Sequence, residues 1–287
     1  MILVVGGTGT VGRLVLESIA AADFETRALV RDLEKARALK LATVEFAQGD
    51  LADPASLAPA LDGVEKVVLI SSFSQDMVRL QTNLVEAAAR APSRPHIIKL
   101  SGVGADPEAP TTMGRWHGAI ERAIQDSGLP WTIVRPAYFM QNILLLAGGI
   151  RKTGAFALPA AGAAVAQIDA RDIAAVIVRV VVEAGHEGKA YDLTGPDAIT
   201  WFEVAELLSA VAERPIRYDP IAPEEFKRRL EGFGTPGWLA DALNELYAVF
   251  RAGSGMHTTD HIRRITNQPP RSFAVFARDH AQAFRTA

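Results

Sequence analysis

The sequence predicts an α/β fold in which a doubly wound parallel sheet carries helices on both faces and precedes a smaller, mostly helical C-terminal portion. Three observations lead to this prediction. Short apolar segments alternate with segments of helical periodicity through the first half of the chain, which is the pattern of strands joined by crossover helices. The apolar segments are hydrophobic along nearly their whole length, as expected for strands covered on both faces. A glycine-rich loop joins the first strand to the first helix.

The alternation begins with the first residues of the chain. Residues 2–5 are a run of strand formers that ends at glycine. In residues 11–22 the apolar side chains recur at the spacing of one helix face. The same reasoning predicts strands at residues 26–30, 44–46, 66–70, 96–100 and 131–134, and helices at residues 33–41, 54–61, 76–91 and 115–126.

The alternation ends after Pro136. Gly148, Gly149 and Gly154 predict loops in an alanine-rich stretch. Further elements are predicted as a helix at residues 172–182, a strand at 190–193, and helices at 201–212, 223–230, 238–250 and 272–284. We therefore expect two domains, residues 1–150 and 151–287, with residues 173–193 returning to the core of the first.

Composition narrows the class of protein. The chain has 287 residues, of which 49% are apolar and 22% charged, a profile typical of a globular protein with a buried core. It has no cysteine, which excludes disulfides, thiolate metal sites and a cysteine nucleophile. The net charge of −3 gives no basic field for nucleic acid, and no apolar run is long enough to span a membrane. No targeting segment is recognisable, so a cytoplasmic location is expected.

The loop between the first strand and the first helix carries the strongest functional signal. Read from Gly6 it has the spacing G-x-x-G-x-x-G, and read from Gly7 it has the spacing G-x-G-x-x-G. In the first spacing Gly6 permits a tight turn, Gly9 lets the backbone approach a pyrophosphate, and Gly12 lets the helix pack closely on the sheet. The phosphates of a dinucleotide would bind the free N–H groups of the helix N-terminus, so residues 1–150 are expected to form a Rossmann domain. The expected cofactor contacts in this loop are Gly6, Thr8, Gly9, Thr10, Val11 and Gly12.

The end of the second strand indicates which nicotinamide cofactor binds. An acidic residue there accepts a hydrogen bond from a ribose 2′-hydroxyl and selects NAD, whereas an arginine favours the 2′-phosphate of NADP. Arg31 holds this place and Asp32 follows it. We therefore expect a preference for NADP(H), with NAD(H) as the alternative. A surface arginine paired with Asp32 or Glu34 is the structural alternative for Arg31.

Further cofactor contacts are expected after the third and fourth strands, at the carboxyl edge of the sheet. Asp50, with Leu51 beside it, could accept a hydrogen bond from the exocyclic amine of adenine, or it could cap a turn. Ser71, Ser72 and Phe73 follow the fourth strand, where a ribose or nicotinamide would lie.

These residues resemble the short-chain dehydrogenase/reductase superfamily and, more closely, its atypical NmrA-like branch. The resemblance rests on the segments 6–12, 29–32, 49–51, 127–130 and 135–142, and it extends over nearly the whole chain. The branch includes NADPH-dependent quinone and triphenylmethane-dye reductases, phenylpropanoid reductases and NADP-sensing regulators. The resemblance implies a Rossmann fold, a nicotinamide cofactor and a small-molecule substrate, and it fixes neither the substrate nor the oligomeric state.

The chain departs from the superfamily at its usual catalytic pair, Tyr-x-x-x-Lys on one helix face. Residues 117–121 resemble the family segment that begins at the lysine, so His117 takes the place of the lysine and Met113 that of the tyrosine. Methionine cannot donate a proton. His117, which ordinarily titrates at about pH 6.5, is the candidate general acid. A structural histidine that orients a loop or the ribose is the alternative.

The remaining candidate site residues follow the fifth and sixth strands. Ser101 lies where the family places its carbonyl-orienting serine, and a capping role is the alternative. After the sixth strand, Tyr138 is expected to contact the cofactor. Phe139, Met140 and Asn142 are expected to form the wall of a substrate pocket, with the Asn142 amide as its polar group. For the aromatic residues the alternative is a plain core cluster.

Two other sets of polar residues have structural interpretations. Asp169 and Asp172 come just before an apolar helix, and we favour a capping role for them over catalysis. His257 and His261 are four residues apart, but Thr258 stands where an H-E-x-x-H zinc motif needs glutamate. No metal site is therefore expected.

The sequence thus favours an NADPH-dependent reductase that transfers hydride to a small, flat, electron-poor acceptor such as a quinone, a dye or an enone. Such acceptors need little acid catalysis because the added charge is delocalised, which agrees with the missing tyrosine. The alternative is a non-catalytic NADP(H)-sensing regulator, which needs only affinity for the cofactor and a conformational response.

Overall fold

The computed structural model describes residues 1–22, 24–37 and 40–285. The chain divides into two compact units. The first unit comprises Met1–Ala109, Gly114–Arg135 and Ile173–Asp192, and the second comprises Pro110–Met113, Pro136–Asp172 and Leu193–Ala287. The chain therefore passes into the second unit at Pro136, before the boundary that the sequence predicts at residue 150, and residues 173–192 belong to the first unit.

The first unit is built on a seven-stranded sheet in the order β3-β2-β1-β4-β5-β6-β9. The strands are β1 (Ile2–Val5), β2 (Thr26–Val30), β3 (Val44–Gln48), β4 (Lys66–Leu69), β5 (His96–Leu100), β6 (Trp131–Pro136) and β9 (Lys189–Leu193). Strands β1 to β6 pair in parallel, and Val5 of the central strand lies opposite Leu29 on one side and Leu69 on the other. The chain winds outward from β1 in both directions, which confirms the predicted doubly wound α/β fold.

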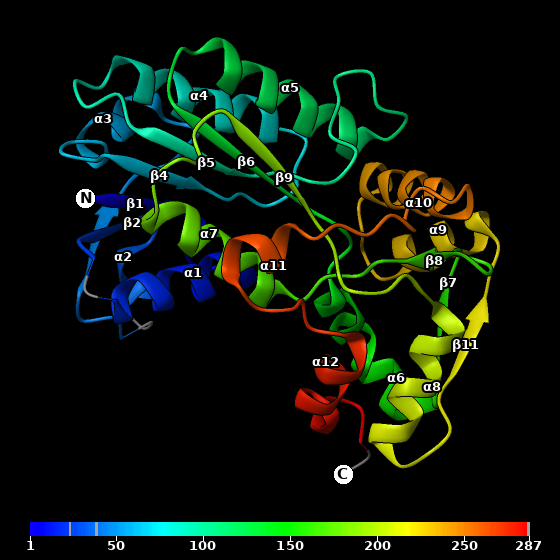
Figure 1. Cartoon of the computed structure of the whole chain (residues 1–287). Coiled ribbons are helices and arrows are strands. Elements are labelled where there is room, and N and C mark those ends of the chain that lie inside the picture. Colours follow the sequence, from blue (N-terminus) through cyan, green and yellow to red (C-terminus); the bar gives the residue numbers. More distant parts are fainter. Residues whose placement is uncertain (23, 38–39, 286–287) are drawn as a thin grey trace. The chain divides into compact units, whose positions relative to one another are not determined.

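Helices cover both faces of this sheet (Figure 1). One face carries α3 (Leu57–Ala60, preceded by the 3-10 turn Pro54–Ser56), α4 (Met77–Arg90) and α5 (Thr112–Asp126), and the other carries α1 (Thr10–Ala21), α2 (Leu33–Arg37) and α7 (Ala170–Val182). Leu84 of α4 and Ile120 of α5 are fully buried in one hydrophobic cluster with Leu3 and Val67 of the sheet. Residues 38 and 39, which the sequence assigns to the second helix, lie outside the described residues.

The second unit is mostly helical, as predicted, and adds two small sheets. Its helices are α6 (Ala147–Thr153), α8 (Trp201–Ala212), α9 (Pro223–Gly232), α10 (Gly237–Arg251), α11 (His261–Thr266) and α12 (Phe273–Asp279), with 3-10 turns at Met140–Leu146 and Ala281–Ala283. Strands β8 (Ala164–Val165) and β10 (Ile199–Thr200) pair antiparallel, and β7 (Ala155–Leu158) and β11 (Arg217–Pro220) pair in parallel. Its core is rich in aromatic residues, with Trp201 in edge contact with Tyr138, Phe156 and Tyr247.

The loop predicted at Gly148 and Gly149 is wrong, because α6 runs through both residues. Ala147 and Ile150 on either side are buried, so the segment gains from helical packing although glycine is a poor helix former. The helix ends at Gly154, whose φ of 69° is the left-handed conformation typical of a glycine helix end. The predicted helix at residues 272–284 is shorter in the structure, because α12 ends at Asp279.

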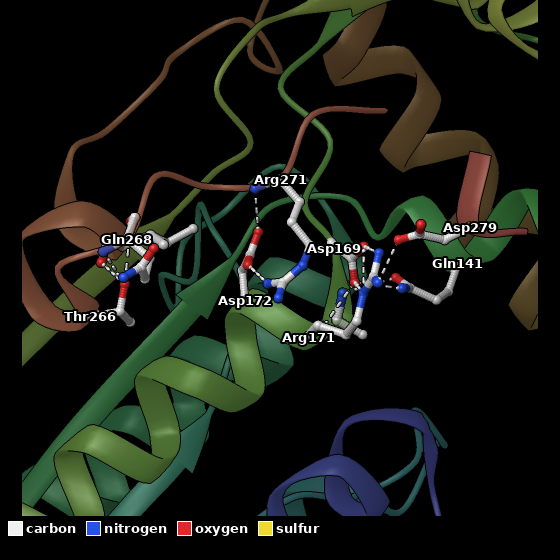
Figure 2. Close-up of polar contacts among 10 residues, drawn as sticks. Gln141, Asp169, Arg171, Asp172, Thr266, Gln268, Arg271 and Asp279 are labelled. Atoms are coloured by element: carbon white, nitrogen blue, oxygen red, sulfur yellow. Dashed lines mark hydrogen bonds and ion pairs between the residues drawn. The ribbon is translucent and has the colours of Figure 1, made fainter. Parts of the chain in front are cut away.

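The start of α7 confirms the predicted structural role of Asp169 (Figure 2). Asp169 Oδ1 accepts a hydrogen bond of 2.9 Å from the Arg171 backbone N–H, which is a cap of the helix start. The Asp169 carboxylate also pairs with the Arg171 guanidinium at 2.6 Å, and Arg171 reaches Asp279 at 2.7 Å. Asp172 instead accepts from the backbone N–H of Arg271 at 2.7 Å and pairs with its guanidinium (Figure 2). These contacts anchor the C-terminal segment of the second unit.

Removal of the Asp172 carboxylate is expected to destabilise the second unit. Asp172 is 3% exposed, and its loss leaves a backbone N–H and a guanidinium without their acceptor. We expect Asp172→Ala to lower the free energy of unfolding by about 1.5–3 kcal/mol, the range for hydrogen bonds to a charged group. The control is Asp241→Ala, which breaks the exposed ion pair with Lys227 and should cost no more than about 1 kcal/mol. Equal urea midpoints for the two variants would contradict the anchoring role.

Candidate functional site

The glycine turn after β1 is closed by two contacts that exclude any side chain. Gly6 has φ of +77°, and a Cβ atom there would lie 2.4 Å from the carbonyl oxygen of Ile70. A Cβ on Gly12 would lie 2.1 Å from the carbonyl oxygen of Gly6. Distances this short are impossible for a real Cβ, so the start of α1 is held against β1 and β4 by backbone approach alone. These are the roles that the sequence predicts for the first and third glycines.

The turn presents the N-terminus of α1 to solvent. Thr8, Gly9 and Thr10 are exposed, whereas Val11 and Gly12 are buried. Gly9 occupies the N-cap, no side chain accepts from the first N–H groups, and the first turn carries no acidic residue. A helix start without a capping oxygen or a carboxylate is suited to an anion. Val11 packs its side chain in the core, so only its backbone N–H could contribute.

The surroundings of Arg31 favour its interpretation as a phosphate ligand. Asp32 accepts a hydrogen bond of 3.1 Å from the Glu34 backbone N–H at the start of α2. Glu34 in turn pairs with Arg37 at 2.6 Å. Among the described residues the exposed Arg31 guanidinium makes no ion pair with either acid, so the paired-arginine alternative gains no support.

The residues after β3 form a compact turn. Asp50 Oδ1 accepts from the Ala52 N–H at 2.9 Å, and the Asp50 N–H donates to Ser56 Oγ at 2.9 Å. The carbonyl of Leu51 accepts from Asn83 Nδ2 at 2.8 Å. This geometry is the turn-capping alternative for Asp50, and the adenine contact stays a prediction.

The three residues predicted after β4 differ in their surroundings. Ser71 Oγ accepts a hydrogen bond of 2.6 Å from Nε2 of the buried Gln81. Ser72 is exposed. The ring of Phe73 lies 4.9 Å from the ring of Trp116 on α5. Ser72 is therefore the one of the three whose side chain is open to solvent.

A buried lysine contacts the candidate histidine. Lys99 on β5 is completely buried, and its Nζ atom donates to the Leu100 carbonyl at 2.6 Å and lies 3.3 Å from Nδ1 of His117 on α5. Burial lowers the pKa of Lys99 to about 7, although the nearby Glu121 carboxylate raises it. Burial, and then the Lys99 charge, lowers the pKa of His117 well below its ordinary value. His117 is therefore neutral at pH 7, and the imidazolium acid considered from its ordinary pKa is disfavoured.

Ser101 belongs to a second buried cluster beside this pair. Its hydroxyl donates to Glu121 Oε1 at 2.5 Å. Arg135 on β6 donates from Nε to the same oxygen at 3.0 Å and from Nη2 to Oε2 at 2.5 Å. Ser101 is 5% exposed and Glu121 is 3% exposed, so the hydroxyl proton of Ser101 is engaged in a buried hydrogen bond to Glu121. This contact gives Ser101 a supporting role here, and the carbonyl-orienting role stays a prediction.

The predicted substrate residues lie in the second unit, at the start of its aromatic core. Tyr138 shares a hydrogen bond of 3.0 Å with Tyr247, and burial raises the pKa of both phenols. The nearby Asn142 side chain partly offsets the rise in the pKa of Tyr138. Met140 is 2% exposed and lines a cavity of about 250 Å³. Phe139 is half-buried and its backbone bridges to Ile168. This arrangement is the core-cluster alternative for Tyr138, and the substrate contacts of Phe139, Met140 and Asn142 stay predictions.

Four polar residues of these clusters were not singled out from the sequence. They are Lys99, Glu121, Arg135 and Tyr247. A signal was present for Lys99, since a lysine inside an apolar strand of a parallel sheet must be buried. The other three become visible only when distant elements pack together.

The described residues include neither a metal-binding cluster nor a membrane-spanning helix. No three histidine or acidic side chains gather there in an arrangement that could hold a metal ion. No helix among those residues is long and apolar enough to cross a membrane.

Comparison with known proteins identifies the family. The family model described as the NmrA-like family matches residues 1–263. The chain belongs to the NmrA-like family. This result confirms the resemblance noted in the sequence.

Within the NmrA-like family the chain is similar to several reductases. It is 45% identical to an NAD(P)H azoreductase of Xenophilus azovorans over 287 residues, which is 100% of both proteins. The solved NADPH-dependent quinone oxidoreductase of Escherichia coli, complexed with NADPH, matches with a TM-score of 0.89 and 30% identity over 96% of this chain and 98% of that one. The triphenylmethane reductase of Citrobacter sp., complexed with NADP(H), matches with a TM-score of 0.87 and 27% identity over 98% and 100%.

The glycine turn fits the phosphates of a nicotinamide dinucleotide. The close approach of Gly6 and Gly12 leaves no room for a side chain at either position, and residues 8–10 beside them are exposed. The uncapped N-terminus of α1 then favours a pyrophosphate electrostatically. This fit agrees with the cofactors in the NADPH and NADP(H) complexes of the two solved relatives.

A methyl group at Gly12 is expected to disrupt this turn. Because its Cβ would meet the Gly6 carbonyl at 2.1 Å, Gly12→Ala should lower the free energy of unfolding by about 1–3 kcal/mol and weaken NADPH binding at least tenfold. The control is Gly148→Ala in α6, where a Cβ meets nothing within 4 Å. That variant should gain up to about 1 kcal/mol and bind NADPH normally. Calorimetry and fluorescence titration measure both effects, and unchanged NADPH affinity in folded Gly12→Ala would contradict the assignment.

Removal of the Arg31 guanidinium is expected to change cofactor preference. Loss of a charge-assisted contact worth about 1.5–3 kcal/mol should raise the Kd for NADPH by about tenfold or more. The Kd for NADH should stay the same, because NADH has no 2′-phosphate. Arg37→Ala, which removes a neighbouring exposed arginine already paired with Glu34, is the matched control. Equal weakening of NADPH and NADH in Arg31→Ala would show that Arg31 does not read the phosphate.

Proposed function

We propose that this protein is an NAD(P)H-dependent reductase that transfers hydride to a small, flat, electron-poor acceptor of the azo, quinone or triphenylmethane-dye type. The similar proteins of the NmrA-like family support this proposal. The azoreductase aligns from end to end at 45% identity, and the quinone and triphenylmethane reductases share the fold over nearly the whole chain.

The observation that carries the proposal is the glycine turn at the start of α1, in a chain that matches an azoreductase over its full length. An uncapped helix start without acidic residues, behind an exposed glycine-rich turn, is suited to the pyrophosphate of a dinucleotide. The position of Arg31 at the end of β2 supports a preference for NADPH over NADH.

The residues of the chain would bind the cofactor, orient the acceptor and supply a proton to its reduced form. When bound, the nicotinamide supplies the hydride. The N–H groups at the start of α1 hold the phosphates, and Arg31 holds the 2′-phosphate. Met113 stands in place of a phenolic donor, and His117 is neutral with one ring proton to share. A delocalised acceptor suits this set of groups, because its reduced form needs only a weak proton donor. The cytoplasm, where NADPH is available, is the location that we propose.

The non-catalytic regulatory alternative is not favoured. Three proteins that are similar to the chain over nearly its full length are named as reductases. The missing tyrosine, which suggested a regulator, is equally compatible with acceptors that need little acid catalysis.

A panel assay tests the proposed function. The protein is incubated with NADPH and, separately, an azo dye, a quinone and a triphenylmethane dye, and loss of nicotinamide absorbance is followed together with product formation. We expect turnover with at least one class, at one NADPH for each quinone or triphenylmethane dye reduced. An azo bond would consume one NADPH to the hydrazine level and two to the amines. Tight NADPH binding without oxidation across the panel would refute the reductase and support the regulator.

A further inference from the structure

Lys99 is placed in the sheet without an acidic partner. It is the fourth residue of β5, and its side chain is 0% exposed. Within the part of the chain that the structure describes, its Nζ atom forms no ion pair and has two polar neighbours, the Leu100 carbonyl at 2.6 Å and His117 Nδ1 at 3.3 Å. A buried ammonium without a carboxylate is costly, so its retention at this place calls for a role in the site.

The nearest carboxylate is occupied by other groups. Glu121 lies one helical turn after His117 on α5, and its two oxygens accept from the Ser101 hydroxyl and from Nε and Nη2 of Arg135. Arg135 also lies 3.8 Å from Asp192 of β9 and feels the charge of Asp106. These charged groups of α5, β6, β9 and the loop after β5 therefore form one network around Arg135. Lys99 therefore has no carboxylate partner, and besides the Leu100 carbonyl its ammonium group contacts His117.

The opposite edge of the imidazole lies beside Gly102, after the end of β5. A Cβ atom built on Gly102 would lie 3.6 Å from His117 Cδ2 and 4.0 Å from Nε2, so this edge of the ring lies over a residue without a side chain. Gly102 comes two residues after the end of β5. In open α/β sheets, ligands bind at the carboxyl ends of the strands. Among the described residues Nε2 has no hydrogen-bond partner, so it is available to one.

We propose that Lys99 is a positioning residue that fixes His117 as the Nε2–H tautomer and resupplies its proton, so that the two side chains relay a proton to the reduced acceptor. This proposal rests on the proposed function. It assigns the proton donor of the reaction to Nε2 of His117 and the source of that proton to Nζ of Lys99.

The protonation states of the pair support the relay. An ammonium can only donate, so with Lys99 charged the His117 Nδ1 atom accepts and the ring proton sits on Nε2. Because burial holds the pKa of Lys99 at about 7, this ammonium can release its proton near neutral pH. Because the pKa of His117 is well below its ordinary value, the ring passes the proton by changing tautomer without becoming an imidazolium.

The proton step balances. As a quinone or azo acceptor gains hydride from the cofactor, its negatively charged atom takes the proton from Nε2 and the Nε2–H bond breaks. Nδ1 takes a proton from Nζ, which leaves a neutral imidazole and a neutral amine. The pair is reset when Nε2 takes a proton from water and Nδ1 returns its own to Nζ. One solvent proton is consumed for each hydride transferred to a quinone or azo acceptor, and no other reactant is required; a cationic triphenylmethane dye becomes neutral on taking hydride and does not use the relay.

The tautomer is measured directly in the wild-type protein, without substrate. Histidine labelled with ¹⁵N gives separate signals for the two neutral tautomers and for the imidazolium, and the His117 signal is assigned by its loss in His117→Gln. We expect a neutral ring with the proton on Nε2 at pH 6, where Lys99 is charged. A dominant Nδ1–H tautomer, or an imidazolium, at pH 6 would overturn the proposal.

Lys99→Met tests the resupply of the proton. The wild-type kcat should fall as pH rises through about 7, because the donating ammonium is lost. Lys99→Met should lower kcat at pH 6 by about tenfold or more, abolish this fall, and leave the Kd for NADPH unchanged. The control is Lys66→Met, which removes a lysine of β4 whose Nζ donates to the Val181 carbonyl, and it should keep the wild-type pH profile. A wild-type kcat and pH profile in Lys99→Met would refute the relay.

The two measurements separate this proposal from the proposed function. If no acceptor is reduced but the ring of His117 carries its proton on Nε2, the reductase assignment fails and the positioning role of Lys99 stands. If acceptors are reduced and the tautomer is wrong, the reductase stands and the relay fails. The tautomer measurement uses the wild-type chain, so it decides the positioning role even if Lys99→Met does not fold.

Discussion

The buried carboxylate of Glu121 is the interaction on which the arrangement of the candidate site depends. It is 3% exposed, and it joins β5, α5 and β6 through Ser101 and Arg135. A buried carboxylate is stable only when its oxygens are satisfied, so α5 is held in one register against the sheet. The same contacts use the acid that would otherwise pair with Lys99. Because Arg135 and Ser101 occupy the oxygens of Glu121, Lys99 contacts His117 instead. The protonation state of His117 therefore depends on a structural salt bridge.

The fold of the first unit could be predicted because its signals are local. Strands buried on both faces must be apolar, and β1, β2 and β4 are recognisable from a few consecutive residues. The second unit offers fewer such signals. Strand β11 has the polar sequence Arg217–Pro220 and is defined by its pairing with β7, about sixty residues earlier. Helix α6 contains two glycines and forms because Ala147 and Ile150 are buried. Tertiary contacts outweigh local preference in both elements.

The candidate site likewise contains residues whose roles follow from local sequence and residues whose roles depend on distant contacts. The roles of Gly6 and Gly12 follow from one strand, one turn and one helix, so their spacing alone predicts a close backbone approach that the geometry bears out. The state of His117 could not be predicted, because it depends on burial and on a lysine eighteen residues earlier in the chain. The ordinary pKa of histidine suggested an imidazolium acid. A charged neighbour in a buried environment makes the neutral ring the stable form instead.

The burial of Lys99 also costs stability, and the sign of this effect is fixed by the shift of its pKa. The folded chain holds the Lys99 proton only up to about pH 7, whereas the unfolded chain holds it up to the ordinary value of 10.5. Between these values the unfolded state binds more protons, so stability rises with pH across this range, and below about pH 7 the full cost is present. An apolar side chain in β5 would avoid this cost. A lysine that destabilises the fold at neutral pH is therefore better explained by its contact with His117 than by any contribution to the core.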